Sequence, residues 1–69
     1  MEKVKITTPY IKLDQLLKYV NAAEHGGMAK IMIQDGLVKV NNEVTTQRGK
    51  KIRSGDIVEI SEYGKIEVE

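Results

Sequence analysis

Hydrophobic positions near the start of the chain recur at every second residue. Val4 and Ile6 alternate with lysines and a threonine within residues 2–7, which is the period of a strand with one buried face. Pro9 lacks the backbone N–H that a continuing strand would use. The pattern therefore predicts a short strand that ends before Pro9.

The hydrophobic period then changes to that of a helix. Leu13, Leu16, Leu17 and Val20 fall at i, i+3, i+4 and i+7, so they form one apolar stripe on a helical surface. We expect this first helix to end at Asn21.

A second, shorter helix is predicted from the glycine pair at 26–27 through about Asp35. Its apolar face consists of Ala29, Met32 and Ile33. Gly36 is a stop signal, because glycine takes the left-handed conformation past a helix end without steric cost. Leu37 follows and can make the hydrophobic contact that often completes such a cap.

Hydrophobic and polar residues alternate again from residue 37 onward. The predicted elements are strands within residues 38–40, 43–45, 57–60 and 65–69, separated by turns at Asn41-Asn42, Ser54-Gly55-Asp56 and Tyr63-Gly64. These turn residues accept the backbone conformations that tight turns require. Residues 45–53, which we call the basic segment, are predicted to form a loop. A strand, two helices and several antiparallel strands together indicate an α+β domain.

Length and composition restrict the class of protein. The 69 residues form one small domain, and 41% hydrophobic and 30% charged residues with one proline indicate a folded chain. The absence of cysteine excludes disulfide scaffolds, thiolate zinc sites and cysteine nucleophiles. The longest uninterrupted apolar run is Ile31-Met32-Ile33, which is too short for a membrane span or a signal-peptide core. We expect a soluble, cytoplasmic, single-domain protein.

The formal net charge of +1 hides an uneven distribution along the chain. Residues 12–53 carry eight basic and four acidic side chains, giving +4, whereas residues 54–69 carry one basic and five acidic side chains, giving −4. The basic residues are densest in the basic segment, which contains Arg48, Lys50, Lys51 and Arg53. Arginine and lysine suit a nucleic-acid backbone. Only three tyrosines could stack on bases, so structured RNA fits better than single strands.

Residues with catalytic or metal-binding chemistry are scarce. The single histidine, His25, lies in a predicted loop, and nothing around Ser54 or Ser61 suggests a catalytic triad. The glycine pair at 26–27 could leave backbone N–H groups free for a phosphate, but it lacks the spacing of a nucleotide-binding loop. We expect no enzymatic activity, no cofactor and no metal site.

Four segments occur in a fixed order: Lys12-Leu13-Asp14-Gln15-Leu16-Leu17, Gly26-Gly27-Met28-Ala29-Lys30, Gly36-Leu37-Val38-Lys39-Val40-Asn41 and Lys51-Ile52-Arg53-Ser54-Gly55-Asp56-Ile57-Val58. Over residues 11–60 they resemble the S-four domain, the RNA-binding domain named after ribosomal small-subunit protein four. With flanking strands at 2–7 and 65–69, the whole chain 1–69 resembles the short, stand-alone bacterial members of YaaA type. The resemblance implies the alpha-L motif, in which two short helices pack on a small antiparallel sheet and face structured RNA with an adjoining loop.

The resemblance and the charge pattern together give the candidate RNA-binding residues: Lys12, Lys30, Gln34, Lys39, Asn41, Gln47, Arg48, Lys50, Lys51 and Arg53. We expect the second helix and the basic segment to form one exposed surface. The chain differs from the family at two places. Many members have Ser-Arg where this chain has the glycine pair, and the usual Asn-Gly turn is Asn41-Asn42 here. The catalytic modules to which this domain is often fused are absent, so no catalytic activity is implied.

These observations favour a non-catalytic protein that binds structured RNA, with ribosomal RNA or the ribosome as partner and a role in ribosome assembly or ribosome association. No membrane and no small-molecule substrate is expected. The alternative is a protein–protein interaction domain that retains the fold and uses its acidic end. A third hypothesis is a DNA-binding helix-turn-helix, in which the second helix would offer only Lys30 and Gln34 as readers beside an acidic Asp35.

Overall fold

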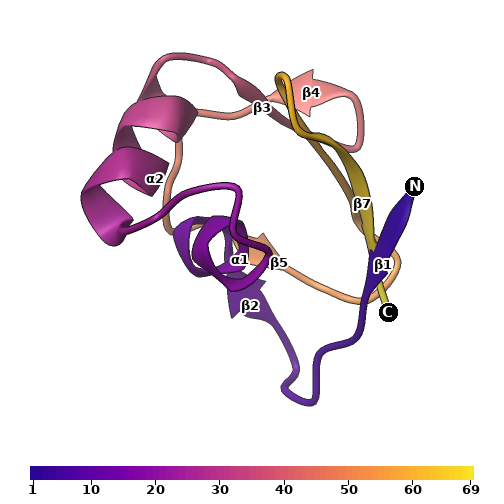
Figure 1. Cartoon of the computed structure of the whole chain (residues 1–69). Helices are drawn as coiled ribbons and strands as arrows, with labels where there is room; N and C mark the ends of the chain where they lie inside the picture. The colour runs from indigo at the N-terminus through magenta and orange to yellow at the C-terminus, as the bar shows by residue number, and fades with distance from the viewer.

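The computed structural model describes residues 1–69, and its two helices cover one side of a curved sheet (Figure 1). The elements follow the chain as β1 (Glu2–Val4), β2 (Ile11–Lys12), α1 (Leu13–Tyr19), α2 (Gly26–Gln34), β3 (Val38–Val40), β4 (Glu43–Val44), β5 (Lys51–Ile52), β6 (Ile57–Ile60) and β7 (Gly64–Val68). Neither helix has the length and apolar character needed to cross a bilayer.

The main sheet has five strands in the order β1-β7-β6-β3-β4. The central pairs are antiparallel, as predicted, whereas β1 runs parallel to β7, with Glu2 opposite Ile66 and Val4 opposite Val68. The predicted fold class is confirmed, although the sheet is mixed. A strand alternates its side chains in the same way in either direction, so the pattern around Val4 did not reveal the parallel pairing.

The core between helices and sheet is entirely hydrophobic, and all fifteen buried residues belong to it. The sheet and the helices together contribute Val4, Val38, Val40, Val58, Ile60, Ile66, Val68, Leu13, Leu16, Leu17, Ala29 and Ile33. The apolar stripe predicted for the first helix is thus confirmed. Ile52 is also fully buried, although it lies among the charges of the basic segment.

Both helices end where the sequence predicts. Asn21 follows α1 with φ 64°, and Gly36 follows α2 with φ 77°. The N–H groups of Gly36 and Leu37 donate to the carbonyls of Ile33 and Met32, both at 3.1 Å. This is the Schellman arrangement, which uses carbonyls that the helix leaves unpaired.

The start of α2 is capped by the single histidine. The backbone N–H of Met28 donates to Nδ1 of His25 at 3.1 Å. The cap satisfies one of the N–H groups that have no partner inside the first helical turn. His25 therefore has a structural role in this fold.

A second sheet, formed by β2 and β5, was not evident from the hydrophobic pattern. Ile11 pairs with Ile52, and Lys12 pairs with Lys51. The prediction that all of residues 45–53 form a loop is therefore wrong at its end, because Lys51 and Ile52 are a strand. Two strand residues are too few to show a period of two, and one of them is a lysine.

The turn between β3 and β4 has the predicted geometry. Asn41 and Asn42 have φ values of 50° and 72°. Two successive residues with positive φ are typical of the type I′ hairpin turn, whose twist matches that of the flanking strands. Asparagine accepts this conformation better than most residues, which explains how the chain does without the usual glycine.

Candidate functional site

The basic segment is attached to the first helix through its backbone. The N–H of Leu13 donates to the carbonyl of Lys50 at 2.9 Å, and the N–H of Asp14 donates to the carbonyl of Arg48 at 3.0 Å. Lys12, at the N-cap position of α1, makes no side-chain cap. Carbonyls of the basic segment therefore take the place of a capping side chain, and they fix Arg48 and Lys50 beside the start of α1.

The β2–β5 sheet brings two candidate lysines together. Lys12 and Lys51 are paired across the two strands, and both are exposed because their neighbours Ile11 and Ile52 face the core. Like charges directly opposite each other on a sheet are destabilising. An anion bound between these lysines would relieve that repulsion, so the pair has the arrangement expected of a phosphate contact.

Tyr10 belongs to this surface, although the sequence analysis did not select it. The ammonium nitrogen of Lys51 lies 4.9 Å from the centre of the Tyr10 ring, within the range of a cation–π interaction. The aromatic ring restricts where the Lys51 side chain points. Tyr10 and Lys51 are far apart in the sequence, so only the pairing of β2 with β5 could reveal the contact.

Gly49 lies at the tip of the basic segment. Its φ is not positive, and a Cβ built on it would meet no atom within 4 Å. Neither the backbone conformation nor internal packing therefore requires glycine here. The position leaves open space between Arg48 and Lys50 on the outside of the segment.

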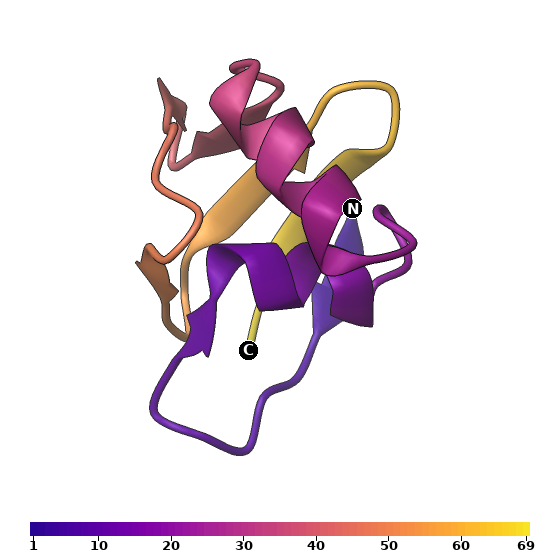
Figure 2. The same ribbon diagram turned by 90° about the vertical axis from the view of Figure 1, so that its left-hand side faces the viewer.

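The second helix lies on the same side of the molecule as the basic segment. Lys30 and Gln34 are exposed on α2 and lie one turn apart. Figure 2 shows the basic segment running along the edge of the face that α1 and α2 form. A Cβ built on Gly26 would lie 3.9 Å from the ammonium nitrogen of Lys18, so α1 adds a further positive charge next to α2. Close contact between Lys30 and the basic segment stays a prediction.

Lys39 lies apart from these residues. Val38 and Val40 on either side of it are buried against the helices, so Lys39 points to the opposite, outer face of the sheet. There it is in register with Glu59 of β6. The structure therefore separates Lys39 from the helices and the basic segment.

Asn41 has an internal role that accounts for its side chain. Its amide nitrogen donates to the carboxylate of Asp56 at 3.1 Å, and its amide oxygen accepts from the N–H of Ile57 at 2.9 Å. The same carboxylate accepts from the N–H of Arg53 at 2.9 Å. Asn41 thus ties the β3–β4 turn to the turn that follows β5, and it holds the backbone at Arg53.

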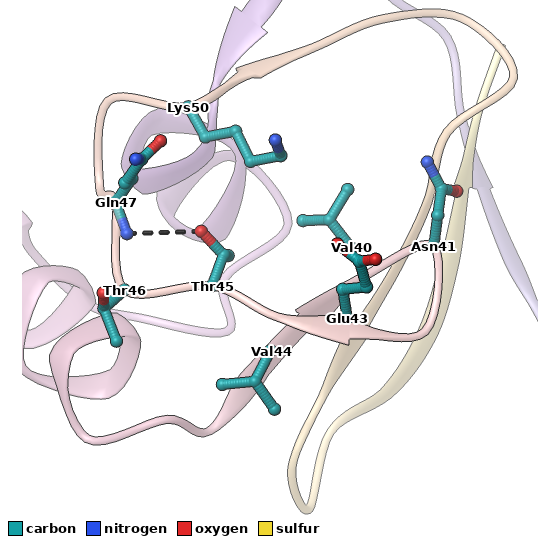
Figure 3. Close-up of a pocket in the computed structure, with 8 residues that line it drawn as sticks. All are labelled: Val40, Asn41, Glu43, Val44, Thr45, Thr46, Gln47 and Lys50. Carbon is teal, nitrogen blue, oxygen red and sulfur yellow. Dashed lines mark hydrogen bonds between the residues drawn. The ribbon is translucent and has the colours of Figure 1, made fainter.

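A polar hollow lies between the β3–β4 hairpin and the basic segment (Figure 3). Its lining includes three of the candidate residues, Asn41, Gln47 and Lys50. Five further residues complete it and are not among the candidate residues: Val40, Glu43, Val44, Thr45 and Thr46. The hollow could not be foreseen because it depends on how the segment returns from β4 to β5.

Tyr63 forms a separate polar contact away from the basic segment. Its hydroxyl lies at hydrogen-bond distance from the carboxylate of Glu2, 2.5 Å, and from the carbonyl of Val20, 3.0 Å. The hydrogen bond to Glu2, with partial burial and the Glu2 charge, raises the pKa of Tyr63 above its ordinary value. This contact joins the start of the chain, the end of α1 and the β6–β7 turn.

No group of three or more histidine, cysteine, aspartate or glutamate residues could hold a metal ion. His25 is used as a helix cap. The exposed basic side chains of the basic segment and of Lys12 have the chemistry to bind an anion.

Comparisons with known proteins show the family to which the chain belongs. A family model described as "S4 domain" matches residues 4–69. The chain is 40% identical over 65 residues, 94% of this chain and 92% of the relative, to "Probable ribosome maturation protein RlbA" of Bacillus subtilis (strain 168). It is 42% identical over 50 residues, 72% of this chain and 71% of the relative, to "Putative RNA-binding protein YbcJ" of Escherichia coli (strain K12). The family predicted from the four sequence segments is confirmed.

Proposed function

Because the chain belongs to the S4 domain family, the S-four domain of the sequence analysis, we propose that it is a non-catalytic RNA-binding protein. Structured RNA would lie against α1, α2 and the basic segment. The names of two relatives, which refer to RNA binding and ribosome maturation, support this proposal. They also favour ribosomal RNA or the ribosome as the partner, and hence a place in the cytoplasm.

The observation that carries the proposal is the backbone attachment of the basic segment to α1. The two hydrogen bonds from Leu13 and Asp14 to the segment hold Arg48 and Lys50 in place, and the β2–β5 pair does the same for Lys12 and Lys51. A flexible basic loop would have to be ordered when RNA binds, which costs conformational entropy. Here the fold has already fixed the backbone that presents the charges.

The distribution of charge on the outer face of the main sheet also supports binding of RNA on the side of the helices. On the outer face of the sheet Glu59 lies in register between Lys39 and Lys65, and Glu67 lies opposite Lys3. Acidic and basic residues are thus matched across strands on that face. The unmatched positive charge lies on the side of the helices and the basic segment, which is where a polyanion would bind.

A salt titration tests the proposal. A protein that neutralises about five phosphates should show log K falling with log salt at a slope of roughly −3.5 to −4.5. We expect this slope for a ribosomal-RNA hairpin, and weaker binding to duplex DNA of the same length because DNA lacks the 2′-hydroxyl. No binding at low salt would contradict RNA binding and favour the protein-interaction alternative. Equal affinity for the DNA would contradict recognition of RNA as such.

A further inference from the structure

The hollow of Figure 3 has the size of a ligand site, and the basic segment of the proposed RNA surface forms one of its walls. Its volume is about 490 Å³, within the range of about 300–1,000 Å³ that is typical of small-molecule sites. One wall is the β3–β4 hairpin and the other is the basic segment. A phosphate backbone running along the basic segment would therefore pass its rim.

Some of the polar groups in the hollow are already used by the fold. The Thr45 hydroxyl accepts from the backbone N–H of Gln47 at 3.2 Å, which is the dashed line in Figure 3. The Asn41 amide is occupied by Asp56 and Ile57. The charged side chains left for a ligand are those of Glu43 and Lys50.

The charges on the two walls have opposite sign. Lys50 is half-buried and reaches into the hollow from the basic segment, while the Glu43 carboxylate belongs to the hairpin (Figure 3). A ligand that was only a phosphate would be repelled by Glu43. A nucleotide suits both walls, because its phosphate is an anion and its base can donate hydrogen bonds to a carboxylate, as cytosine does through its amino group.

An apolar contact is available beside these groups. Val40 lies across the strands from Glu43 and its side chain points into the hollow (Figure 3), so it offers a small apolar contact to a base. Val44 is paired with Lys39, and its side chain points away from Glu43 and Lys50. A paired base cannot enter, because its edge is used by its partner in the duplex. Bases in bulges and loops can be turned out of the helix and bound by their edges.

We propose that this hollow receives one unpaired nucleotide of the bound RNA, with its phosphate at Lys50 and with a base that carries an exocyclic amino group at Glu43. Adenine, cytosine and guanine meet this requirement. Uracil has no such group, and its ring N–H lies between two carbonyl oxygens that a carboxylate repels. The inference rests on the proposed function and adds a preference for a particular feature of the RNA.

The experiment uses hairpins that differ only in one bulged nucleotide, together with the fully paired hairpin. The wild-type protein should bind a hairpin with an adenine, cytosine or guanine bulge about tenfold more tightly than the paired one, since one charge-assisted hydrogen bond is worth about that factor. A uracil bulge should bind close to the paired hairpin. Glu43→Gln should reduce the preference for amino-bearing bulges about fivefold and should not weaken binding of the paired hairpin.

The matched control is Glu59→Gln, which removes the same charge on the outer face of the sheet and should leave the preference unchanged. Equal binding of bulged and paired hairpins would overturn the inference while leaving RNA binding intact. If Glu43→Gln raises the affinity for every hairpin equally, Glu43 only repels phosphate and the inference is likewise overturned. If no hairpin binds at low salt, the proposed function fails and the inference fails with it.

Discussion

Side-chain contacts distinguish the residues that stabilise the fold of this chain from those that form its charged surface. The Asn41 side chain is used within the fold, by Asp56 and Ile57, so a loss of RNA binding on its replacement would report a displaced turn. The Lys12 and Lys51 side chains are exposed on paired strands. Under the proposed function, a loss of RNA binding on their replacement would report a lost contact and not a change in the fold.

The hydrogen-bonded hydroxyl of Tyr63 predicts how the stability of the protein depends on pH. Its raised pKa means that the folded protein keeps the phenolic proton to higher pH than the unfolded chain, whose tyrosine titrates near 10.0. The contribution of this group to stability is therefore complete below pH 10 and is lost as the pH rises through the folded pKa. We expect Tyr63→Phe to cost about 0.5–1.5 kcal/mol at pH 7, measured by urea unfolding. The difference between wild type and variant should narrow above pH 10, and a constant difference up to pH 11 would contradict the assigned hydrogen bond.

At the scale of the elements, the sequence predicted those with a clear period or a clear terminator. The stripe from Leu13 to Val20 and the stop at Gly36 are both confirmed, because they depend on local periodicity and on one residue's conformational freedom. The β2–β5 sheet was missed, since two-residue strands have no period. The cap of α1 was missed for a related reason. Its acceptors are backbone carbonyls some 35 residues further along the chain, and no residue type marks such an acceptor in the sequence.

The cap of α2 can be tested with two variants. His25→Ala removes the acceptor for the Met28 N–H and should cost about 0.5–2 kcal/mol in the free energy of unfolding. His25→Asn should retain most of the stability, because asparagine is a preferred N-cap. Both variants should bind RNA like the wild type, since His25 serves the helix end. Loss of RNA affinity in a folded His25→Asn protein would show that the histidine contacts the ligand.

At the scale of the whole molecule, the two faces of the main sheet separate two roles. One face buries the core beneath the helices, and the basic segment joins the helix side by hydrogen bonds to α1. The outer face carries Lys39 among acidic and basic neighbours in register. The family and the basic segment could be found from the sequence. The separation of Lys39 from the helices and the basic segment could not be found from the sequence, because it depends on which side of β3 faces the helices.

The central claim, that the basic segment is an RNA-binding surface held by the fold, is tested most directly by charge reversal. Lys51→Glu with Arg53→Glu should reduce the affinity for a ribosomal-RNA hairpin at least about a hundredfold, because two charge-assisted contacts are replaced by repulsion. The free energy of unfolding should change by no more than about 1 kcal/mol, since both side chains are exposed and only the contact with Tyr10 is lost. The control, Lys3→Glu with Lys65→Glu, makes the same charge change on the outer face and should leave most of the affinity. Unchanged RNA affinity in the folded Lys51→Glu, Arg53→Glu protein, or an equal loss in the control, would contradict the claim.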